Sequence, residues 1–295
     1  MMMNKTMTWT ASALLATTLL LPTAASAEQI VDKTIITLGE SLGAKDKAWV
    51  LSRLNAPEGI TPIIATSADE EKYLGKNIPQ SQRGGGMYSS AKIELAEKGD
   101  GLSVATENIT WVTKDMYLNA LVTAGVTDAD ITITSPYKVT GTSALTGIMK
   151  AYDQTSAETG IKLTDERKDL AQQELSVTSD VGKTVGTDKV ADLMNEIKAE
   201  IAKQKPETKV EIENVIVQVI QNNNINLSDA QMDRLTGLFN QMEQADLNWG
   251  QIESGLKDAG QDIQAFATSE ETKGFFAKLF DALSSFFNSI AGWFK

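Results

Sequence analysis

Residues 111–152, WVTKDMYLNALVTAGVTDADITITSPYKVTGTSALTGIMKAY, contain the pattern that decides the fold of this chain. Thr113 is a suitable N-cap for a helix, because its hydroxyl can accept a hydrogen bond from the first turn. Apolar residues then recur at three- and four-residue spacing over residues 116–124, which indicates one buried stripe. Gly125 follows, as is typical of the left-handed residue that ends a helix. The first half of the stretch therefore predicts a capped, amphipathic helix.

The second half of the stretch predicts a strand and another helix. Residues 131–134 alternate as ITIT and stop just before Pro136, which suits a strand. Thr142 can begin a second helix, whose apolar residues share one face up to Tyr152. A strand, a helix, a strand and a helix in close succession predict a sheet with helices packed on it.

The segment before this stretch carries a second β signal. Residues 87–98 alternate between apolar and polar side chains, and the alternation resumes at residues 102–104. Residues 98–101, KGDG, form a turn sequence between the two runs. Two alternating runs that are joined by such a turn predict a β-hairpin.

Short signals mark the starts of several helices. Residues 67–70, SADE, and residues 228–231, SDAQ, match the capping box, in which a Ser or Thr pairs with an acid or amide three residues later. Pro206 suits the first position of another helix, because no backbone N–H is needed there. From about residue 158 the pattern is helical throughout, and its apolar stripes are typical of a helical bundle. A cofactor-lined wall is the alternative interpretation of those stripes.

The change from a period of two to a period of 3.6 predicts an α+β protein with several parts. We expect a signal peptide at residues 1–27 and a mixed α/β sheet domain at residues 28–155. An all-helical domain is expected at residues 156–267. A linker and an aromatic-rich C-terminal amphipathic helix are expected at residues 268–295.

The first 27 residues have the three parts of a secretory signal peptide. Lys5 provides a positive charge, residues 11–21 an apolar core, and residues 25–27, ASA, a cleavage site. The apolar core is too short to span a bilayer. No cysteine follows it to accept a lipid anchor. We therefore expect a secreted, extracellular protein.

The composition excludes several classes of site. The chain contains no cysteine and no histidine, so it has no disulfide, no Ser-His-Asp triad, no Cys-His dyad and no His-ligated zinc. General acid–base chemistry would fall to carboxylates, lysines or tyrosines. The formal net charge of −12 opposes binding to nucleic acid. We expect no cofactor and no metal, and the oligomeric state is left open.

Three short patterns suggest chemistry only weakly. Residues 182–184, GKT, resemble the end of a phosphate-binding loop, but Val177 stands where that loop needs a glycine, and a loop between helices is the simpler interpretation. Ser135 and Lys138 have the Ser-x-x-Lys spacing of serine acyl-enzymes, which place the serine at a helix N-terminus. Carboxylates such as those at residues 69–71, 128 and 130 suit a glycosidase pair or calcium, or simply a solvated surface.

The last segment, residues 273–295, reads KGFFAKLFDALSSFFNSIAGWFK and carries a formal charge of +2. Its large apolar residues recur at helical spacing, which predicts an amphipathic helix lying in a membrane interface or against a partner. Packing of the same face on the protein's own core is the alternative. The residues expected to make the contact are Phe276, Leu279, Phe280, Leu283, Phe287, Ile290, Trp293 and Phe294.

Several longer segments carry a family resemblance. They are LGESL at residues 38–42, EEKYLG at 70–75, NITWVTKDMYLNALVTAGV at 108–126, SALTGIMKAY at 143–152, LTDERKDLAQQEL at 163–175 and LNWGQIESGLKD at 247–258. Together they resemble the YpuA-like secreted proteins of Gram-positive bacteria, a family that is defined by a domain of unknown function. The resemblance implies an exported or envelope-associated protein and assigns no catalytic or binding residue. It covers nearly all of residues 30–265 and omits the tail.

The sequence therefore favours an exported, non-enzymatic binding or interaction module of the cell envelope, with the C-terminal helix as its contact to a membrane surface or a partner. The alternative is a cell-wall-directed hydrolase that uses carboxylates or the Ser135/Lys138 pair.

Overall fold

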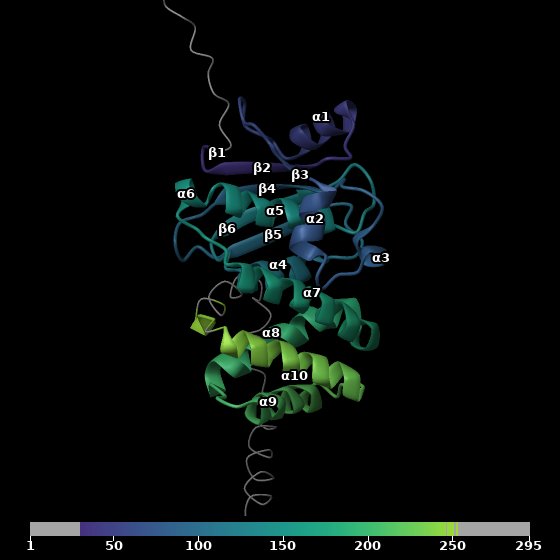
Figure 1. Ribbon diagram of the computed structural model, residues 1–295, viewed down its shortest axis with the longest axis vertical. Coiled ribbons are helices and arrows are strands. Elements are labelled where there is room, and N and C mark those ends of the chain that lie inside the picture. The colour runs from purple at the N-terminus through teal and green to yellow at the C-terminus, as the bar shows by residue number, and fades with distance from the viewer. Residues whose placement is uncertain (1–29, 246, 251, 253–295) are drawn as a thin grey trace, which may run out of the picture.

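The computed structural model describes residues 30–245, 247–250 and 252 of the 295-residue chain (Figure 1). The strands are β1 (Ile30–Val31), β2 (Thr34–Gly39), β3 (Ile63–Ala65), β4 (Ser90–Leu95), β5 (Leu102–Thr106) and β6 (Ala129–Thr134). The helices are α1 (Ala44–Arg53), α2 (Ser67–Leu74), α3 (Gln80–Arg83), α4 (Lys114–Ala124), α5 (Thr142–Gln154), α6 (Ser156–Thr159), α7 (Asp165–Val185), α8 (Thr187–Gln204), α9 (Lys209–Asn222) and α10 (Asp229–Gln244). The fold is α+β, as predicted: the described strands all precede residue 135, and helices follow.

The strands form one mixed sheet with the order β1-β2-β4-β6-β5, and β3 pairs with β2 beside this path. The pairs β1–β2, β2–β4 and β4–β6 are antiparallel, whereas β5 runs parallel to β6 and β3 runs parallel to β2. A parallel pair of adjacent strands needs a crossover, and α4 provides it between β5 and β6. The predicted strand at residues 131–134 is therefore present as part of β6, next to the edge of the path.

The predicted hairpin at residues 87–104 is wrong. β4 and β5 do not pair with each other, because β6 lies between them and pairs with both. Ile131 and Ile133 of β6 are buried, whereas most of β5 is exposed, so burial of apolar surface favours β6 in the inner position. The turn keeps its shape through Asp128, whose Oδ1 accepts hydrogen bonds from the N–H groups of Gly99 (2.6 Å) and Gly101 (3.2 Å).

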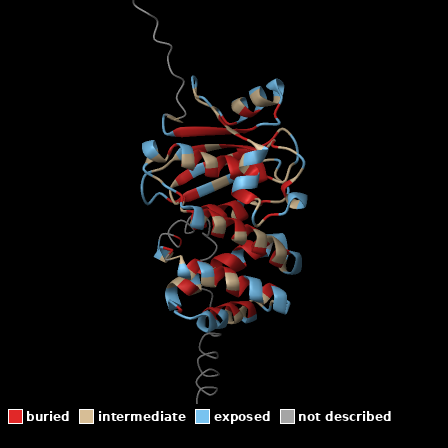
Figure 2. Ribbon diagram, in the orientation of Figure 1, coloured by how far each residue is buried: buried red, intermediate tan, exposed pale blue. Residues whose placement is uncertain are grey.

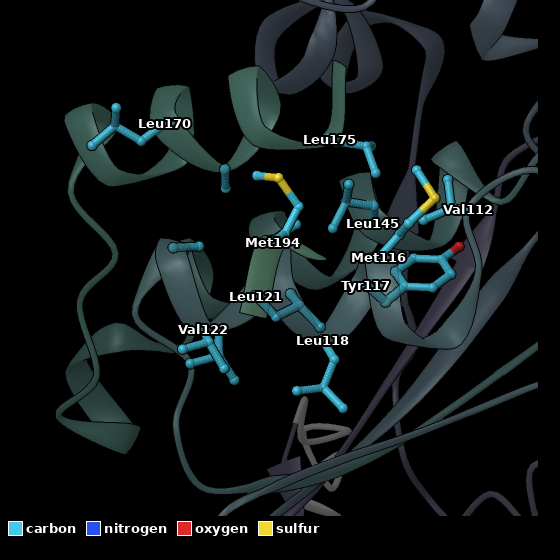
Figure 3. Close-up of a cluster of buried hydrophobic side chains, with 14 of the residues drawn as sticks. Val112, Met116, Tyr117, Leu118, Leu121, Val122, Leu145, Leu170, Leu175 and Met194 are labelled. Atoms are coloured by element: carbon cyan, nitrogen blue, oxygen red, sulfur yellow. The ribbon is translucent and has the colours of Figure 1, made fainter. Parts of the chain in front are cut away.

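Helix α4 lies at the centre of the molecule. The sequence pattern predicts one buried stripe on this helix, but residues 116–124 are all buried. One side of α4 packs on β5, and other sides contact α7 and α8. Figure 3 shows side chains of α4 in one cluster with Leu145 of α5, Leu175 of α7 and Met194 of α8, and Leu170 of α7 belongs to the same cluster. A helix that is covered all round is a core helix, which explains why its polarity pattern is weak.

Helices α7 to α10 continue from α4 along the long axis of the molecule (Figure 1). Contacts join α7 to α8 and α10, and α9 to α8 and α10. Their apolar residues belong to the same hydrophobic cluster as the sheet and α4. Figure 2 shows buried residues in red in both parts. The core therefore runs without a break from the sheet into the helices. None of the described helices is both long and apolar enough to cross a bilayer.

Most helix ends follow the sequence signals. Thr113 caps α4 by accepting a hydrogen bond from Met116 N, and Gly125 ends it in the left-handed conformation. The capping box of α10 is present at Ser228. Two starts differ from the prediction, because Thr66 rather than Ser67 caps α2, and Thr208 rather than Pro206 begins the capping box of α9. In both corrections a threonine stands three residues before an acid, which completes the reciprocal pair of hydrogen bonds.

Limited proteolysis tests the predicted boundary between the mixed domain and the helical domain. Trypsin should cut the native protein first at Lys162, because this residue is exposed between α6 and α7. The two fragments should stay together on size exclusion, because α4 and α7 are in extensive contact. Mass spectrometry would identify the cut. A first cut inside α7, or fragments that separate without denaturant, would contradict this expectation.

Candidate functional site

A cleft of about 410 Å³ opens where α5, α6 and α7 meet. Its lining residues come from the C-terminal half of α5, from α6, from the connecting loop and from the first turn of α7. They are Asp153, Ser156, Lys162, Leu163, Thr164, Asp165 and Lys168. Thr164 is the N-cap of α7 and fixes the start of that helix by accepting a hydrogen bond from Arg167 N. Helix geometry then places Lys168 one turn into α7, beside α5.

Lys168 is the centre of a charged network in this cleft, and it is almost fully buried. Its Nζ lies 2.9 Å from both carboxylate oxygens of Asp153 and 2.9 Å from Oδ1 of Asp165. Tyr73 of α2 donates its hydroxyl hydrogen to Oδ2 of Asp153 at 2.7 Å. The Nζ of Lys72 lies 3.2 Å from the same hydroxyl and 4.5 Å from the centre of the Tyr73 ring. The network around Lys168, which reaches from the cleft to α2, therefore contains two carboxylates, two lysines and a phenol.

The pKa values of Lys168, Asp165 and Tyr73 are all shifted further from neutral pH. Burial lowers the pKa of Lys168, but the hydrogen bonds to Asp165 and Asp153 outweigh it and leave that pKa raised. The hydrogen bond from Lys168 lowers the pKa of Asp165. Burial, reinforced by the bond to Asp153, raises the pKa of Tyr73. Proton transfer is most efficient when the pKa lies near the working pH. These three groups instead keep fixed protonation states at neutral pH, so the arrangement suits holding a ligand or the fold.

A second polar cluster is closed off from solvent. The Nζ of Lys198 in α8 lies 2.6 Å from Oε1 of Glu174 in α7, and each side chain is only 1% exposed. The same Nζ donates to Oδ1 of Asn119 (2.9 Å) and Oγ1 of Thr123 (3.0 Å) in α4, and Thr123 donates to Glu174. Burial lowers the pKa of Lys198, and Glu174 opposes this effect. This enclosed network joins three helices and has no route for a substrate.

The sequence analysis did not predict either network, although charged residues at buried helix positions indicate one of them. Lys198 stands among Met194, Ile197 and Ile201 on the buried face of α8. Glu174 stands in the same way on the buried face of α7. A charge at a core position of an amphipathic helix needs a buried partner, so these positions are recognisable as a class. The pairing itself depends on how the helices pack, which the pattern does not contain.

The structure places Ser135 and Lys138 in a turn after β6. Ser135 is fully buried, and its hydroxyl accepts a hydrogen bond from the N–H of Tyr137 at 3.3 Å. Its carbonyl accepts a hydrogen bond from the side chain of Asn108 at 2.8 Å. A serine acyl-enzyme needs this serine at the start of a helix, with the lysine one turn later. Here the residues form a corner that connects β6 to the loop before α5.

The other chemical patterns have structural roles in the described part of the chain. Residues 182–184 lie in the last turns of α7 and not in a loop, so the interpretation as a loop between helices is wrong. Asp69 completes the capping box of α2 with Thr66 and forms an ion pair with Lys150 at 2.7 Å. Asp130 accepts a hydrogen bond from Ser103. Among the described residues, no cluster of three or more acidic side chains is arranged to hold a metal ion.

The predicted membrane or partner contacts lie outside the described residues. This holds for Phe276, Leu279, Phe280, Leu283, Phe287, Ile290, Trp293 and Phe294, and for the signal peptide at residues 1–27.

Comparison with known proteins places the chain in a family. Residues 38–259 match the family described as "Protein of unknown function (DUF1002)". The chain is 41% identical over 278 residues to "Uncharacterized protein YpuA" of Bacillus subtilis (strain 168), and the match covers 94% of this chain and 95% of that protein. No solved structure matches the chain. Both matches span the sheet and the helical part, and on their strength the chain belongs to the DUF1002 family of proteins of unknown function.

Proposed function

We propose that the protein is an exported, envelope-associated interaction module that has no catalytic role and contacts the membrane surface through residues 274–294. The signal-peptide pattern of residues 1–27 supports export. The amphipathic spacing of the tail supports an in-plane, interfacial helix, because its polar face is incompatible with spanning a bilayer.

The observation that carries this proposal is the surface of the folded body. In the part of the chain that the structure describes, only three large hydrophobic side chains are exposed: Trp49, Tyr137 and Val210. They lie on α1, on the turn after β6 and on α9. The apolar stripes of α7 to α10 are buried against one another and against α4. The described body therefore offers no broad apolar face to receive the tail, which favours an external surface as its partner.

The energetics of the tail agree with this partner. Burial of one Phe side chain stabilises by about 1.5–3 kcal/mol, so several on one face can offset the loss of freedom on binding a surface. The charge of +2 on residues 273–295 attracts anionic lipid modestly, while the acidic remainder of the chain is repelled. Added salt should weaken the attraction and leave the apolar contribution in place.

The cleft at α5–α7 supports an interaction role over catalysis. Its lysine and carboxylates neutralise one another, and the pKa shifts of Lys168 and Asp165 stabilise the charged forms. A glycosidase needs one carboxyl group that stays protonated near neutrality. Asp165 has the opposite shift.

Vesicle co-sedimentation tests the proposal. The protein without residues 1–27 should sediment with vesicles that contain anionic phospholipid, and a variant that ends at Thr268 should stay in the supernatant. The double variant Phe280→Asp/Phe287→Asp should also lose binding, because both charges fall on the apolar face.

The matched control is Ser285→Asp/Asn288→Asp, which adds the same charge to the polar face of the predicted helix. It should retain most of the binding at moderate salt. If all four proteins sediment alike, the tail is not the contact. If both double variants lose binding equally, charge rather than the apolar face determines binding, and the interfacial helix is refuted.

A further inference from the structure

One half of the sheet has an uncovered face. The face towards α2, α4 and α5 is buried in the main core. On the other face, α1 packs with side chains of β2, such as Ile36 and Leu38, and of β3, and this second cluster includes no side chain of β4, β5 or β6. The registers place Lys92 of β4, Thr132 of β6 and Ala105 of β5 in one row on that second face. Ala105 is exposed, and Lys92 and Thr132 are partly exposed. A polar strip of β4, β6 and β5 is therefore open beside α1.

The flank of α1 forms a wall along this strip. Asp46, Trp49 and Arg53 are three and four residues apart, so they lie along one side of the helix. The hydroxyl of Tyr137 donates to Oδ2 of Asp46 at 3.0 Å. Arg53 donates from Nε and an Nη to the two carboxylate oxygens of Glu107, at 2.7 and 2.9 Å. Both bridges reach from α1 to the ends of β5 and β6, and Trp49 lies on the helix between them.

The wall presents two exposed aromatic rings. Trp49 is 40% exposed and Tyr137 is 49% exposed, and they are the only large aromatic side chains with this exposure among the described residues. The ring of Tyr137 is held edge-to-face against Tyr88, with 5.7 Å between centroids. The bond to Asp46 holds its other end. An exposed ring that is fixed at both ends loses little conformational freedom when a ligand stacks on it.

We propose that this Trp49–Tyr137 surface binds an uncharged, β-1,4-linked polysaccharide. Pyranose rings in such a chain are flat and present apolar C–H faces, which stack on aromatic rings, while their hydroxyl groups lie at the edges. Arg53 and Glu107 provide donors and acceptors in a fixed geometry for those hydroxyls. Large aromatic side chains with an adjacent rim of satisfied polar groups are typical of binding hot spots.

The charge of the surface selects an uncharged ligand. Arg53 is paired with Glu107, and Lys92 lies 2.8 Å from Glu94, so the local charges largely cancel. The whole chain has a net charge of −12, which repels anionic polymers. An aromatic surface without net positive charge is therefore complementary to a neutral glycan.

A pull-down with insoluble polysaccharides tests this proposal on the protein that comprises residues 28–295. Chitin and cellulose are the probes, and the bound fraction is measured against protein concentration. The parental protein should be retained by at least one of them, with little dependence on salt. Trp49→Ala and Tyr137→Ala should each weaken retention about tenfold, and Trp49→Phe should retain most of it because it keeps an aromatic face.

The matched control is Val210→Ala, which removes the third exposed hydrophobic side chain from the distant helix α9. It should bind like the parent, and thermal unfolding of each variant should show a folded protein at the assay temperature, so that lost retention reports the surface and not unfolding. Failure of the parent to bind either polysaccharide overturns the proposal, as does equal retention of Trp49→Ala and the parent. Vesicle binding by the tail should be unchanged in Trp49→Ala, so the two sites can fail independently.

Discussion

Replacement of Lys198 by Met is expected to lower the free energy of unfolding by about 3–5 kcal/mol, because it leaves Glu174 as an uncompensated buried charge. Both side chains are 1% exposed, so water cannot replace the lost ammonium group. Asn119 and Thr123 lose a hydrogen-bond donor at the same time. Urea titration followed by circular dichroism would measure the change. This loss is a large fraction of the free energy of unfolding of an average domain, which is about 5–15 kcal/mol.

Two variants make this expectation specific to the buried pair. Lys198→Met combined with Glu174→Leu should recover part of the loss, because the isolated charge is gone and only the hydrogen bonds of α4 remain unsatisfied. Lys203→Met, on an exposed turn of the same helix, removes an ion pair with Glu200 and should change stability by less than about 1 kcal/mol. Equal effects at positions 198 and 203 would show that burial does not decide the outcome.

Gly39→Ala is expected to destabilise the fold by about 3 kcal/mol or more, because the new methyl group would collide with the backbone of the neighbouring segment. A Cβ atom on Gly39 would lie 2.2 Å from the carbonyl oxygen of Met87. That oxygen also accepts the hydrogen bond from Ser41 N, so it cannot move freely. The loss should be measured by urea titration.

Gly237→Ala provides the opposite control. Apart from the adjacent backbone of α10 itself, no atom lies within 4 Å of a Cβ placed on Gly237, which is in the interior of α10. An alanine there should stabilise the protein by about 0.5–1 kcal/mol, because it reduces the freedom of the unfolded chain. Destabilisation by both variants, or by neither, would contradict the steric explanation.

Local sequence signals predicted those features of the fold that depend on a single residue, such as the ends of helices. Thr113 and Gly125 mark both ends of α4, because capping depends only on neighbouring atoms. The errors arise where distant segments compete. The turn at residues 98–101 looks like a hairpin turn, yet β6 is the better neighbour for both strands. Strand pairing depends on burial and on the whole sheet, which a local pattern does not contain.

The candidate site was less predictable than the fold. The cleft depends on Lys168 of α7 meeting Asp153 of α5 and Tyr73 of α2, three residues from separate helices. Each is unremarkable in the sequence, because charged and aromatic residues are common on helix surfaces. The Trp49–Tyr137 surface is similar, since exposure appears only after α1 has packed on β2. Sequence patterns identify the buried faces of helices and strands well, but they do not show which residues from different elements meet at the surface.

The position of β6 between β4 and β5 affects the order in which the chain can fold. β4 and β5 precede α4, but each lacks its inner neighbour until residues 129–134 arrive. Closing loops of this length costs entropy before any pairing is gained, which slows the formation of non-local sheets. The β5–α4–β6 unit must therefore assemble before the sheet is complete. Insertion of β6 supplies the missing neighbour of both strands, so we expect the β4–β6–β5 half of the sheet to form in one late, cooperative event.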